Sequence, residues 1–512
     1  MTHIAEVLLT DLGSLVAELG KDGGLIGPSI YDTAQVLRWA PPHEGTRPAL
    51  DWLCMQQRSD GGWGDPNIPL ARTVPTLAAA IALHLYCETA RDRSALAAAL
   101  AFLRSEERTW PDKLPNDVPV GAELIAPSLL VEAHRVGLEI PETPYASLLA
   151  LGQRRSKMMG AIRVQPGTTV SHIVEAISDE IRSGLVDFYG SVGHSPAATA
   201  AWLHKTEGST EEHQVRARAM EYLTQAAAVT GVDIPGVVPT AWPITRFEQS
   251  FVLYALLLGD LLVHPRLQGA LREQYKDLSA ALHPTGLGFS DHFMADGDDT
   301  AAAIAVLRVA GQPVSLEGLE VFNNGDHYSA YRGELQVSVT VTARAVHALR
   351  LFGRDVSRNE EFLLSHQDPD GAWRGDKWNG SWLYATLQVI AGLRRGPVRQ
   401  ALEKTYGFLL EQQRPDGSWG TQRNGSTEET AYGILSLRLL ETDGIGDTAK
   451  TRVALRRAAH WMLVHYQPFC REQPPFWIAK ETYRPERIAR AFELSALLSV
   501  LNFVDPESAF IG

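Results

Sequence analysis

A seven-residue pattern, Gln-x-x-Asp-Gly-x-Trp, occurs three times along this chain and limits its fold more than any other feature of the sequence. The three copies begin at Gln57, Gln367 and Gln413. An Asp-Gly pair favours a tight turn because glycine adopts positive φ values without strain, and tryptophan buries a large ring while its indole N–H still finds a partner. Repeated units of two helices and a turn stack side by side. The pattern therefore predicts repeated architecture, and it lacks a nucleophile or base that would indicate chemistry.

The segments around these turns carry the apolar spacing of amphipathic and buried helices. Apolar residues recur at i, i+3, i+4 and i+7, whereas the alternation of β-branched residues that is typical of strands is scarce. The clearest helical segments are residues 76–86, 95–103, 251–262, 301–309, 343–351, 386–393 and 430–440. The sequence predicts an all-α fold of paired helices joined by turns rich in Gly, Pro and Asp.

Composition narrows the class of protein further. The chain has 512 residues, which is enough for two domains with separate cores. Its formal charge is −13 and it has no run of five or six Lys or Arg, so we expect neither a nucleic-acid partner nor an anionic membrane surface. The N-terminus lacks a signal-peptide pattern and no apolar stretch is as long as a membrane span, which predicts a cytoplasmic protein without integral membrane contact. Only three cysteines occur, without a C-x-x-C pair, so a disulfide framework or thiolate zinc site is not indicated.

An acidic cluster precedes the helical segment at 301–309. Asp296, Asp298 and Asp299 lie within four residues, and like charges this close cannot all ionise, so at least one carboxyl group should hold a proton near neutral pH. A plain helix start is the alternative, with Asp299 and Thr300 as the N-cap. A calcium loop is excluded, because it would need glycine where Ala301 stands and a glutamate six residues later.

The repeats and the Asp-x-Asp-Asp motif together resemble the class II terpene cyclases, which include squalene–hopene cyclases and plant copalyl diphosphate synthases. Further segments that resemble bacterial and plant class II diterpene cyclases follow in the same order at residues 31–34, 123–127, 195–200, 376–378 and 476–480. The resemblance covers nearly the whole chain. It implies two α-helical (α/α) barrel domains, called β and γ, with an active site between them.

The resemblance also implies how the chain is divided. We expect residues 1–23 to pack with the β domain, residues 24–238 to form the inserted γ domain, and residues 239–512 to form the β domain that carries the acidic motif. An N-terminal segment that joins the C-terminal half would make the γ domain an insertion.

The acidic motif and one histidine are the expected catalytic groups. An alkene is a weak base that needs a strong acid, and the resemblance implies Asp298 as the proton donor, with Asp296 and Asp299 holding its proton in place. His172 resembles the histidine that removes the last proton in plant ent-copalyl diphosphate synthases. The family asparagine that assists it is replaced here by Thr240, so a different base arrangement could lead to halimadienyl or clerodienyl skeletons.

Other residues are expected to bind the diphosphate and to line the cavity. The resemblance implies Lys377 and Lys480 as diphosphate ligands, with Arg484 as a helper, and Glu123 as a ligand of Mg²⁺. Aromatic faces stabilise carbocations, and the candidates for the cavity are Trp378, Trp242 and Tyr189, although aromatic residues are also common in plain cores. No Asp-Asp-x-x-Asp motif occurs, so the diphosphate should survive into the product.

These expectations combine into one function. The sequence predicts a class II diterpene cyclase that converts geranylgeranyl diphosphate into a bicyclic labdane-type diphosphate, either copalyl diphosphate or a rearranged form. Its product would suit a downstream class I terpene synthase. The alternatives are a drimenyl-type synthase acting on farnesyl diphosphate, a catalytically silent isoprenoid-binding protein, and a subunit resembling protein prenyltransferases. The last is disfavoured because no zinc constellation is evident.

Overall fold

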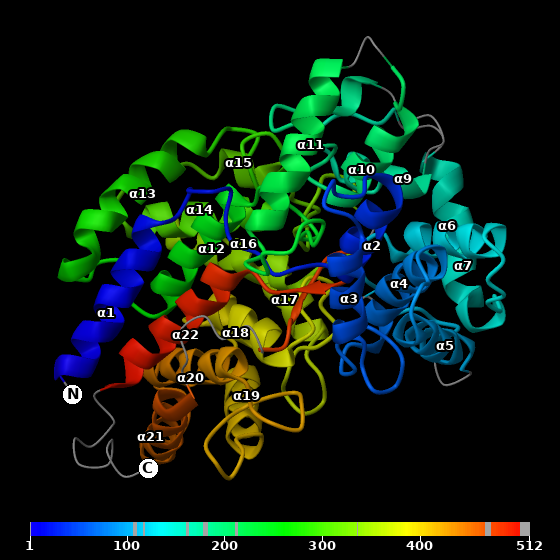
Figure 1. Cartoon of the computed structure of the whole chain (residues 1–512). Coiled ribbons are helices and arrows are strands. Elements are labelled where there is room, and N and C mark those ends of the chain that lie inside the picture. The colour runs from blue at the N-terminus through cyan, green and yellow to red at the C-terminus, as the bar shows by residue number, and fades with distance from the viewer. Residues whose placement is uncertain are drawn as a thin grey trace.

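The computed structural model describes residues 2–105, 110–115, 118–159, 163–177, 183–209, 213–334, 336–465 and 473–501. These residues are mostly helical, with two short antiparallel hairpins, which confirms the all-α prediction (Figure 1). The hairpins pair β1 (Leu287–Gly288) with β2 (Ala295–Asp296), and β3 (Trp477–Ile478) with β4 (Thr482–Tyr483). No helix among the described residues is long and apolar enough to cross a membrane.

A closed ring of six inner helices forms the C-terminal half. They are α12 (Thr245–Leu258), α14 (Gly297–Val309), α16 (Val339–Leu351), α18 (Trp382–Leu393), α20 (Thr427–Thr442) and α22 (Glu486–Val500). Each packs against the next, and α22 returns to α12. The outer helices are α13 (Gln268–Ala281), α15 (Glu317–Glu320), α17 (Ser357–Ser365), α19 (Arg399–Glu411) and α21 (Thr448–His465). Two layers of helices around one axis make an α/α barrel, and they explain why inner helices such as α14 are buried on nearly every face.

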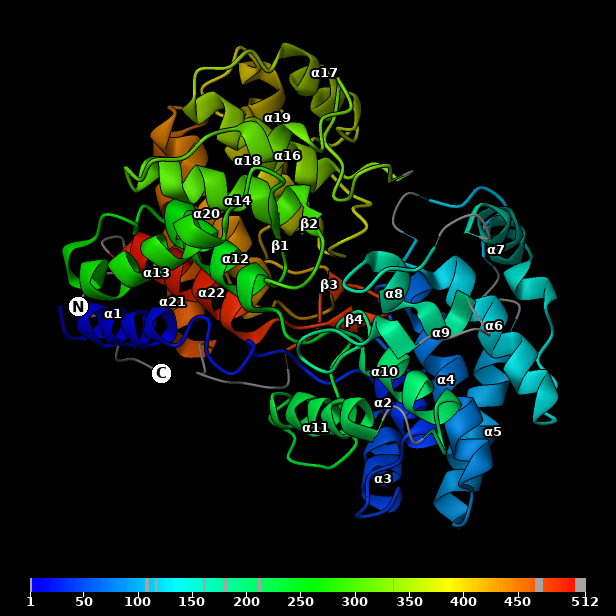
Figure 2. The same ribbon diagram turned by 90° about the horizontal axis from the view of Figure 1, so that it is seen from above.

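A second ring forms the N-terminal half (Figure 2). Its inner helices α2 (Ile30–Trp39), α4 (Thr73–Leu85), α6 (Ala122–Arg135), α9 (Val174–Ile177) and α10 (Pro196–Lys205) contact one another in turn, and α10 returns to α2. Helices α3 (Arg47–Gln56), α5 (Ala90–Arg104), α7 (Ala146–Met159) and α11 (His213–Ala228) surround them, and α8 (Thr169–His172) precedes α9. Short 3₁₀ turns occur at Pro69–Arg72, Thr143–Tyr145, Ser183–Leu185 and Pro265–Leu267.

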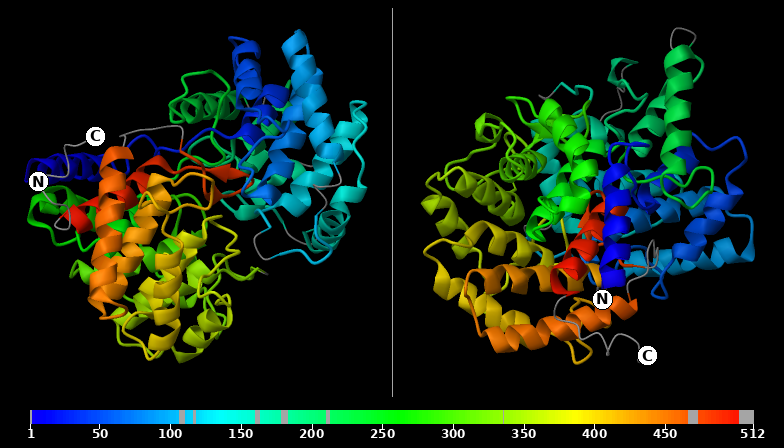
Figure 3. Two further views of the ribbon diagram at one scale, coloured as in Figure 1. Left: turned by 90° about the horizontal axis from the view of Figure 1, so that it is seen from below. Right: turned by 90° about the vertical axis from the view of Figure 1, so that its left-hand side faces the viewer.

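The first helix belongs to the C-terminal ring in space. Helix α1 (Thr2–Ala17) packs against α13 and α22. The adjacent blue and red ribbons of Figure 3 are α1 and α22. Its apolar residues share one hydrophobic core with residues 251–501, whereas residues 31–242 form two other clusters. The exact domain limits drawn from the sequence stay a prediction.

The three repeated turns have one structure. Trp63, Trp373 and Trp419 are fully buried, and each indole N–H donates to a leucine carbonyl ten residues earlier, at 2.8, 2.7 and 2.9 Å. The glycine of each turn has a positive φ between 87° and 103°. The structural interpretation of the pattern is confirmed.

A row of arginines at the start of α22 joins distant segments. Arg484 pairs with Glu428 and Glu493, Arg487 pairs with Glu248 at 2.8 Å, and Arg490 pairs with Asp11 of α1. The backbone supports the same junction, because Gly27 N donates to Arg484 O and Glu486 N donates to Leu25 O. The Arg490–Asp11 ion pair and these two backbone hydrogen bonds fix the N-terminal segment to the last helix and the residues just before it.

Candidate active site

The acidic motif lies where the β1–β2 hairpin runs into α14. Asp296 has an extended backbone and is the N-cap, because its Oδ1 accepts hydrogen bonds from Asp298 N at 3.0 Å and Asp299 N at 2.8 Å. The alternative prediction, that Asp299 and Thr300 form the N-cap, is therefore wrong, because the helix begins directly after Asp296. Capping fixes the direction in which the next two carboxylates leave the helix.

Asp296 and Asp299 influence each other's protonation. Burial, followed by the neighbouring Asp299, raises the pKa of Asp296 well above its usual value. Burial also raises the pKa of Asp299 to about 6, although the Ser250 hydroxyl donates to that carboxylate at 2.6 Å. The two groups are hydrogen-bonded to each other and cannot both ionise easily in a dry site. The pair holds a proton near neutral pH, as the crowding predicts.

Asp298 has a different environment. Its side chain is 15% exposed and forms an ion pair with Arg344, which is fully buried. Arg344 Nη2 also donates to Tyr384 OH at 2.7 Å, and the guanidinium lies 4.4 Å from the ring centre of Phe251. A fixed cation stabilises the carboxylate that remains after proton loss. Arg344 was not predicted from the sequence, although a single arginine inside the largely apolar segment 341–349 was a signal.

His172 is held as a neutral ring. It ends α8, and its Nδ1 donates to Gly193 O at 2.8 Å, since a carbonyl can only accept. Burial, with Lys480 and His194 nearby, lowers the pKa of His172 well below its usual value. The lone pair is therefore on Nε2, which is the state a base requires. Thr240 is fully buried, and its hydroxyl makes no hydrogen bond to the described part of the chain.

Lys377 and Glu123 come from different helical rings, and each pairs with a residue of the opposite charge. Lys377 is buried, pairs with Glu334, and donates to Gln336 O at 3.0 Å. Glu123 is 2% exposed and pairs with Arg155 of α7. Burial lowers the pKa of Lys377, Glu334 opposes that shift, and Arg155 adds to it, which places the guanidinium within electrostatic reach of the ammonium. Two cation–carboxylate pairs, one from each ring, are thus within electrostatic reach of each other.

Lys480 and Arg484 have carboxylate partners inside the protein. Lys480 Nζ donates to Asp32 Oδ1 at 2.6 Å and to Ser195 Oγ at 2.8 Å, and it is 1% exposed. Arg484 is surrounded by the carboxylates of Glu428, Glu486 and Glu493. Their role as diphosphate ligands stays a prediction, and their contacts join the two rings and the N-terminal segment.

Glu481 lies beside this junction and makes stability depend on pH. It accepts from Tyr31 N at 3.4 Å, and burial raises its pKa from 4.5 to about 8. The folded carboxyl binds its proton more tightly than the unfolded one, so its contribution to stability is greatest below pH 4.5 and is lost as the pH rises to about 8. We expect Glu481→Gln to raise the melting temperature, relative to the unaltered protein, more at about pH 8 than at about pH 5. Calorimetry at both pH values would contradict this if the two differences were equal.

The three aromatic candidates lie in different surroundings. Trp378 is half-buried and meets Tyr331 edge to face, with ring centres 6.3 Å apart. Tyr189 contacts the rings of two histidines near the β1–β2 loop. Trp242 is 6% exposed, donates from its indole to Asp22 O at 3.1 Å and packs on Tyr222. These contacts make Trp242 part of a core cluster, and a role for any of the three in the cavity stays a prediction.

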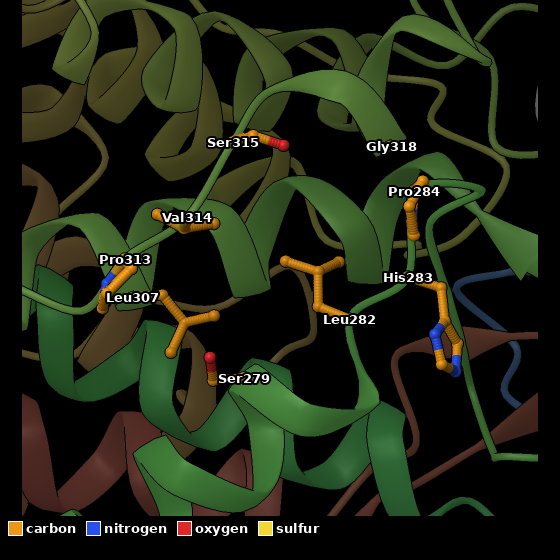
Figure 4. Close-up of a pocket in the computed structure, with 9 residues that line it drawn as sticks. All are labelled: Ser279, Leu282, His283, Pro284, Leu307, Pro313, Val314, Ser315 and Gly318. Carbon is orange, nitrogen blue, oxygen red and sulfur yellow. The ribbon is translucent and has the colours of Figure 1, made fainter.

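A cleft of about 160 Å³ lies elsewhere on the C-terminal ring (Figure 4). Leu307 from the far end of α14, Leu282 and His283 after α13, and Val314 are among its lining residues. None of the described residues that line this cleft is a carboxylate or a permanent cation. It is separate from the acidic motif.

Two closed helical rings and an acid triplet at a helix N-terminus, two of whose members are buried, define a protein of the class II terpene cyclase type. The model of the squalene-hopene cyclase C-terminal domain matches residues 335–443. The chain is 44% identical to a (+)-kolavenyl diphosphate synthase of Herpetosiphon aurantiacus over 98% of this chain and 99% of that protein. It is 32% identical to a copalyl diphosphate synthase of Streptomyces cyslabdanicus, over 94% of each.

The solved structures agree with these relatives. The ent-copalyl diphosphate synthase of Streptomyces platensis superimposes with a TM-score of 0.79 at 28% identity, covering 96% of this chain and 99% of that one. The chain belongs to the bacterial class II diterpene cyclases, and it is an enzyme.

Proposed function

We propose that this enzyme converts geranylgeranyl diphosphate into a bicyclic diphosphate of the labdane or rearranged clerodane type, with the diphosphate retained. The observation that carries the proposal is the acid triplet, in which Asp298 pairs with the buried Arg344 while Asp296 and Asp299 share a proton. The 44% identity to a kolavenyl diphosphate synthase, together with Thr240 where plant enzymes have asparagine, favours a rearranged skeleton.

Asp298 starts the reaction by protonating the terminal alkene of the substrate. The proton leaves the carboxylic acid, the alkene π electrons form the new C–H bond, and the resulting cation is attacked by the next alkene as a ring closes. Arg344 and the N-terminus of α14 stabilise the carboxylate that remains. Asp296 and Asp299 hold a second proton close to Asp298, and solvent restores the acid before the next turnover.

His172 ends the reaction by taking a proton from the final cation on its Nε2. A neutral imidazole is a competent acceptor, whereas a cationic ring would repel the substrate cation. The position of the base relative to the newly closed carbon rings of the substrate decides how many hydride and methyl shifts occur before the proton is removed. The faces of Trp378 and Tyr189 are suited to stabilising these cations.

Lys377 and Arg155 bind the diphosphate in this proposal. Mg²⁺ commonly uses one or two protein carboxylates and completes its shell with substrate phosphates and water. The described residues contain no group of three or more His, Cys, Asp or Glu side chains that could hold a metal ion. Glu123 and Glu334 therefore fit Mg²⁺ only together with the diphosphate, and the ion would supply charge neutralisation there.

The remaining assignments belong to the same proposal. Lys480 and Arg484 act as struts, because Lys480 joins the two rings and Arg484 joins α20 to α22 within the C-terminal ring. Residues 24–238 form the γ domain, and residues 239–512 form the β domain, with which residues 1–23 pack. A product that keeps its diphosphate suits an enzyme that ionises it, so a class I terpene synthase is the natural consumer.

The purified protein should be incubated with geranylgeranyl or farnesyl diphosphate and Mg²⁺, and the dephosphorylated products analysed by gas chromatography and mass spectrometry. A bicyclic alcohol from the C20 substrate supports the proposal, and one from the C15 substrate alone replaces it with a drimenyl-type synthase. Linear alcohols from both would leave only a binding role.

We expect Lys377→Met to raise the KM for geranylgeranyl diphosphate roughly tenfold or more, with a smaller change in kcat, because a charge-assisted contact to the diphosphate is lost. Steady-state kinetics at fixed Mg²⁺ would measure both parameters. The matched control is Lys276→Met, an exposed lysine of α13 that should leave them unchanged. A fall in kcat at constant KM would instead assign Lys377 to the chemical step.

A further inference from the structure

One tight turn of the N-terminal ring touches both the proposed base and the loop that leads to the acid triplet. At its centre are Gly193 and His194, with φ values of 59° and 58°. The left-handed region is uncommon for a residue with a side chain and costs energy, so it persists only where the surroundings impose it. His194 is fully buried, and Trp242 N donates to its carbonyl at 2.9 Å.

Gly193 holds the base. Its carbonyl accepts the Nδ1–H of His172 at 2.8 Å and so fixes both the orientation and the tautomer of that ring. A Cβ atom at position 193 would overlap the backbone of Ser171 and His172. Only glycine allows this approach without moving the base.

His194 holds the acid-bearing loop. Its Nδ1 donates to Asp187 Oδ2, which can only accept, over 3.0 Å, and its Nε2 shares a hydrogen bond with the Ser290 hydroxyl at 2.5 Å. Ser290 lies between β1 and β2, shortly before Asp296. The series of hydrogen-bonded Asp, His and Ser side chains resembles a hydrolase triad. Ser290 is 2% exposed and lies between the two packed helical rings, so it anchors the loop and does not act as a nucleophile.

Further contacts attach the same loop to the segment that carries the base. Met294 N donates to Gly167 O at 2.7 Å, and Gly167 shortly precedes α8. The Phe293 ring meets His194 at 5.3 Å and His172 at 6.5 Å between centres. The acid and the base come from different rings, and this turn and loop connect them.

We propose that Gly193 and His194 are positioning residues that fix the His172 base relative to the acid triplet and thereby select which proton is removed from the final cation. The inference rests on the proposed function, in which Asp298 starts the reaction and His172 ends it. Small displacements of a reacting group change rates strongly, and a misplaced base loses the competition with water and with other exit routes.

Gly193→Ala tests this inference, with Gly190→Ala as the matched control. Gly190 is in the same loop with a φ of 85°, but its added Cβ would overlap Arg218 O and not the base. We expect the ratio of main product to other bicyclic and hydroxylated products to fall roughly fivefold or more in Gly193→Ala, at similar KM, and to stay unchanged in Gly190→Ala.

Ser290→Ala is a milder second variant that removes only the hydroxyl bound to His194. We expect a fall in the same ratio of roughly threefold, with recovery in Ser290→Thr, because one hydrogen bond is lost and then restored. Thr73→Val, which removes a hydroxyl that accepts from Trp110 inside the N-terminal ring at 3.1 Å, should lower stability without altering the ratio. Unchanged ratios in both Gly193→Ala and Ser290→Ala, with a wild-type enzyme that forms bicyclic products, overturn the inference. A wild-type enzyme that cyclises neither substrate overturns the proposed function instead.

Discussion

Asp298→Asn is expected to lower the turnover of geranylgeranyl diphosphate by roughly 10³-fold or more, because the amide keeps the shape of the side chain but cannot donate a strongly acidic proton. Asparagine still offers an oxygen to Arg344, so the buried guanidinium keeps a partner and the fold should survive. Product formation measured over long incubations would give the residual rate, and circular dichroism would check the fold.

The matched control for this substitution is Asp291→Asn. Asp291 lies in the same loop as Ser290, is 46% exposed and pairs with Arg246, so we expect turnover close to that of the unaltered enzyme. Wild-type turnover in Asp298→Asn would show that another group donates the proton, and Asp296 or Asp299 would become the candidate.

Arg484→Met is expected to lower the free energy of unfolding by roughly 3–5 kcal/mol, because removing one member of a buried charge cluster leaves the others uncompensated. Arg484 is 7% exposed and is the shared partner of Glu428, Glu486 and Glu493. Burial already raises the pKa of Glu428, and loss of the guanidinium would raise it further. Urea unfolding at neutral pH would measure the change.

An exposed ion pair gives the control for this effect. Arg399 and Glu403 are 58% and 49% exposed, so Arg399→Met should change stability by no more than about 0.5 kcal/mol. If Arg484→Met were equally mild while KM for the substrate rose, the residue would be a diphosphate ligand, as the sequence first indicated, and not a strut.

The parts of this enzyme that could be predicted from its sequence are those whose cause is local. The glycine and tryptophan that determine each of the three turns lie within seven residues, and the three carboxylates of the acid triplet lie within four. The N-cap was misplaced because Asp296 and Asp299 are both good capping residues, and only the hairpin before α14 decides between them.

The partners of the site residues could not be predicted, because they come from distant parts of the chain. Arg344 reaches Asp298 over 46 positions, and Lys480 reaches Asp32 over 448. A lysine in a family motif is compatible with either a ligand or a strut, and only its surroundings distinguish the two. For the same reason Arg155, Glu334 and His194 had no signal of their own in the sequence.

The junction between α1 and α22 has a consequence for how the enzyme is made. Asp11 leaves the ribosome early, but its partner Arg490 lies 479 positions later, so the first helix waits while nearly the whole chain is synthesised. At roughly 5–20 residues per second this delay is on the order of half a minute or more. Until α22 is made, α1 can contact its partner α13 but lacks the part of its native surface that α22 supplies, whereas the N-terminal ring, which needs only residues up to about 242, can already form. The inserted ring is therefore the part that can fold first, and the helix synthesised first is among the last to complete its packing.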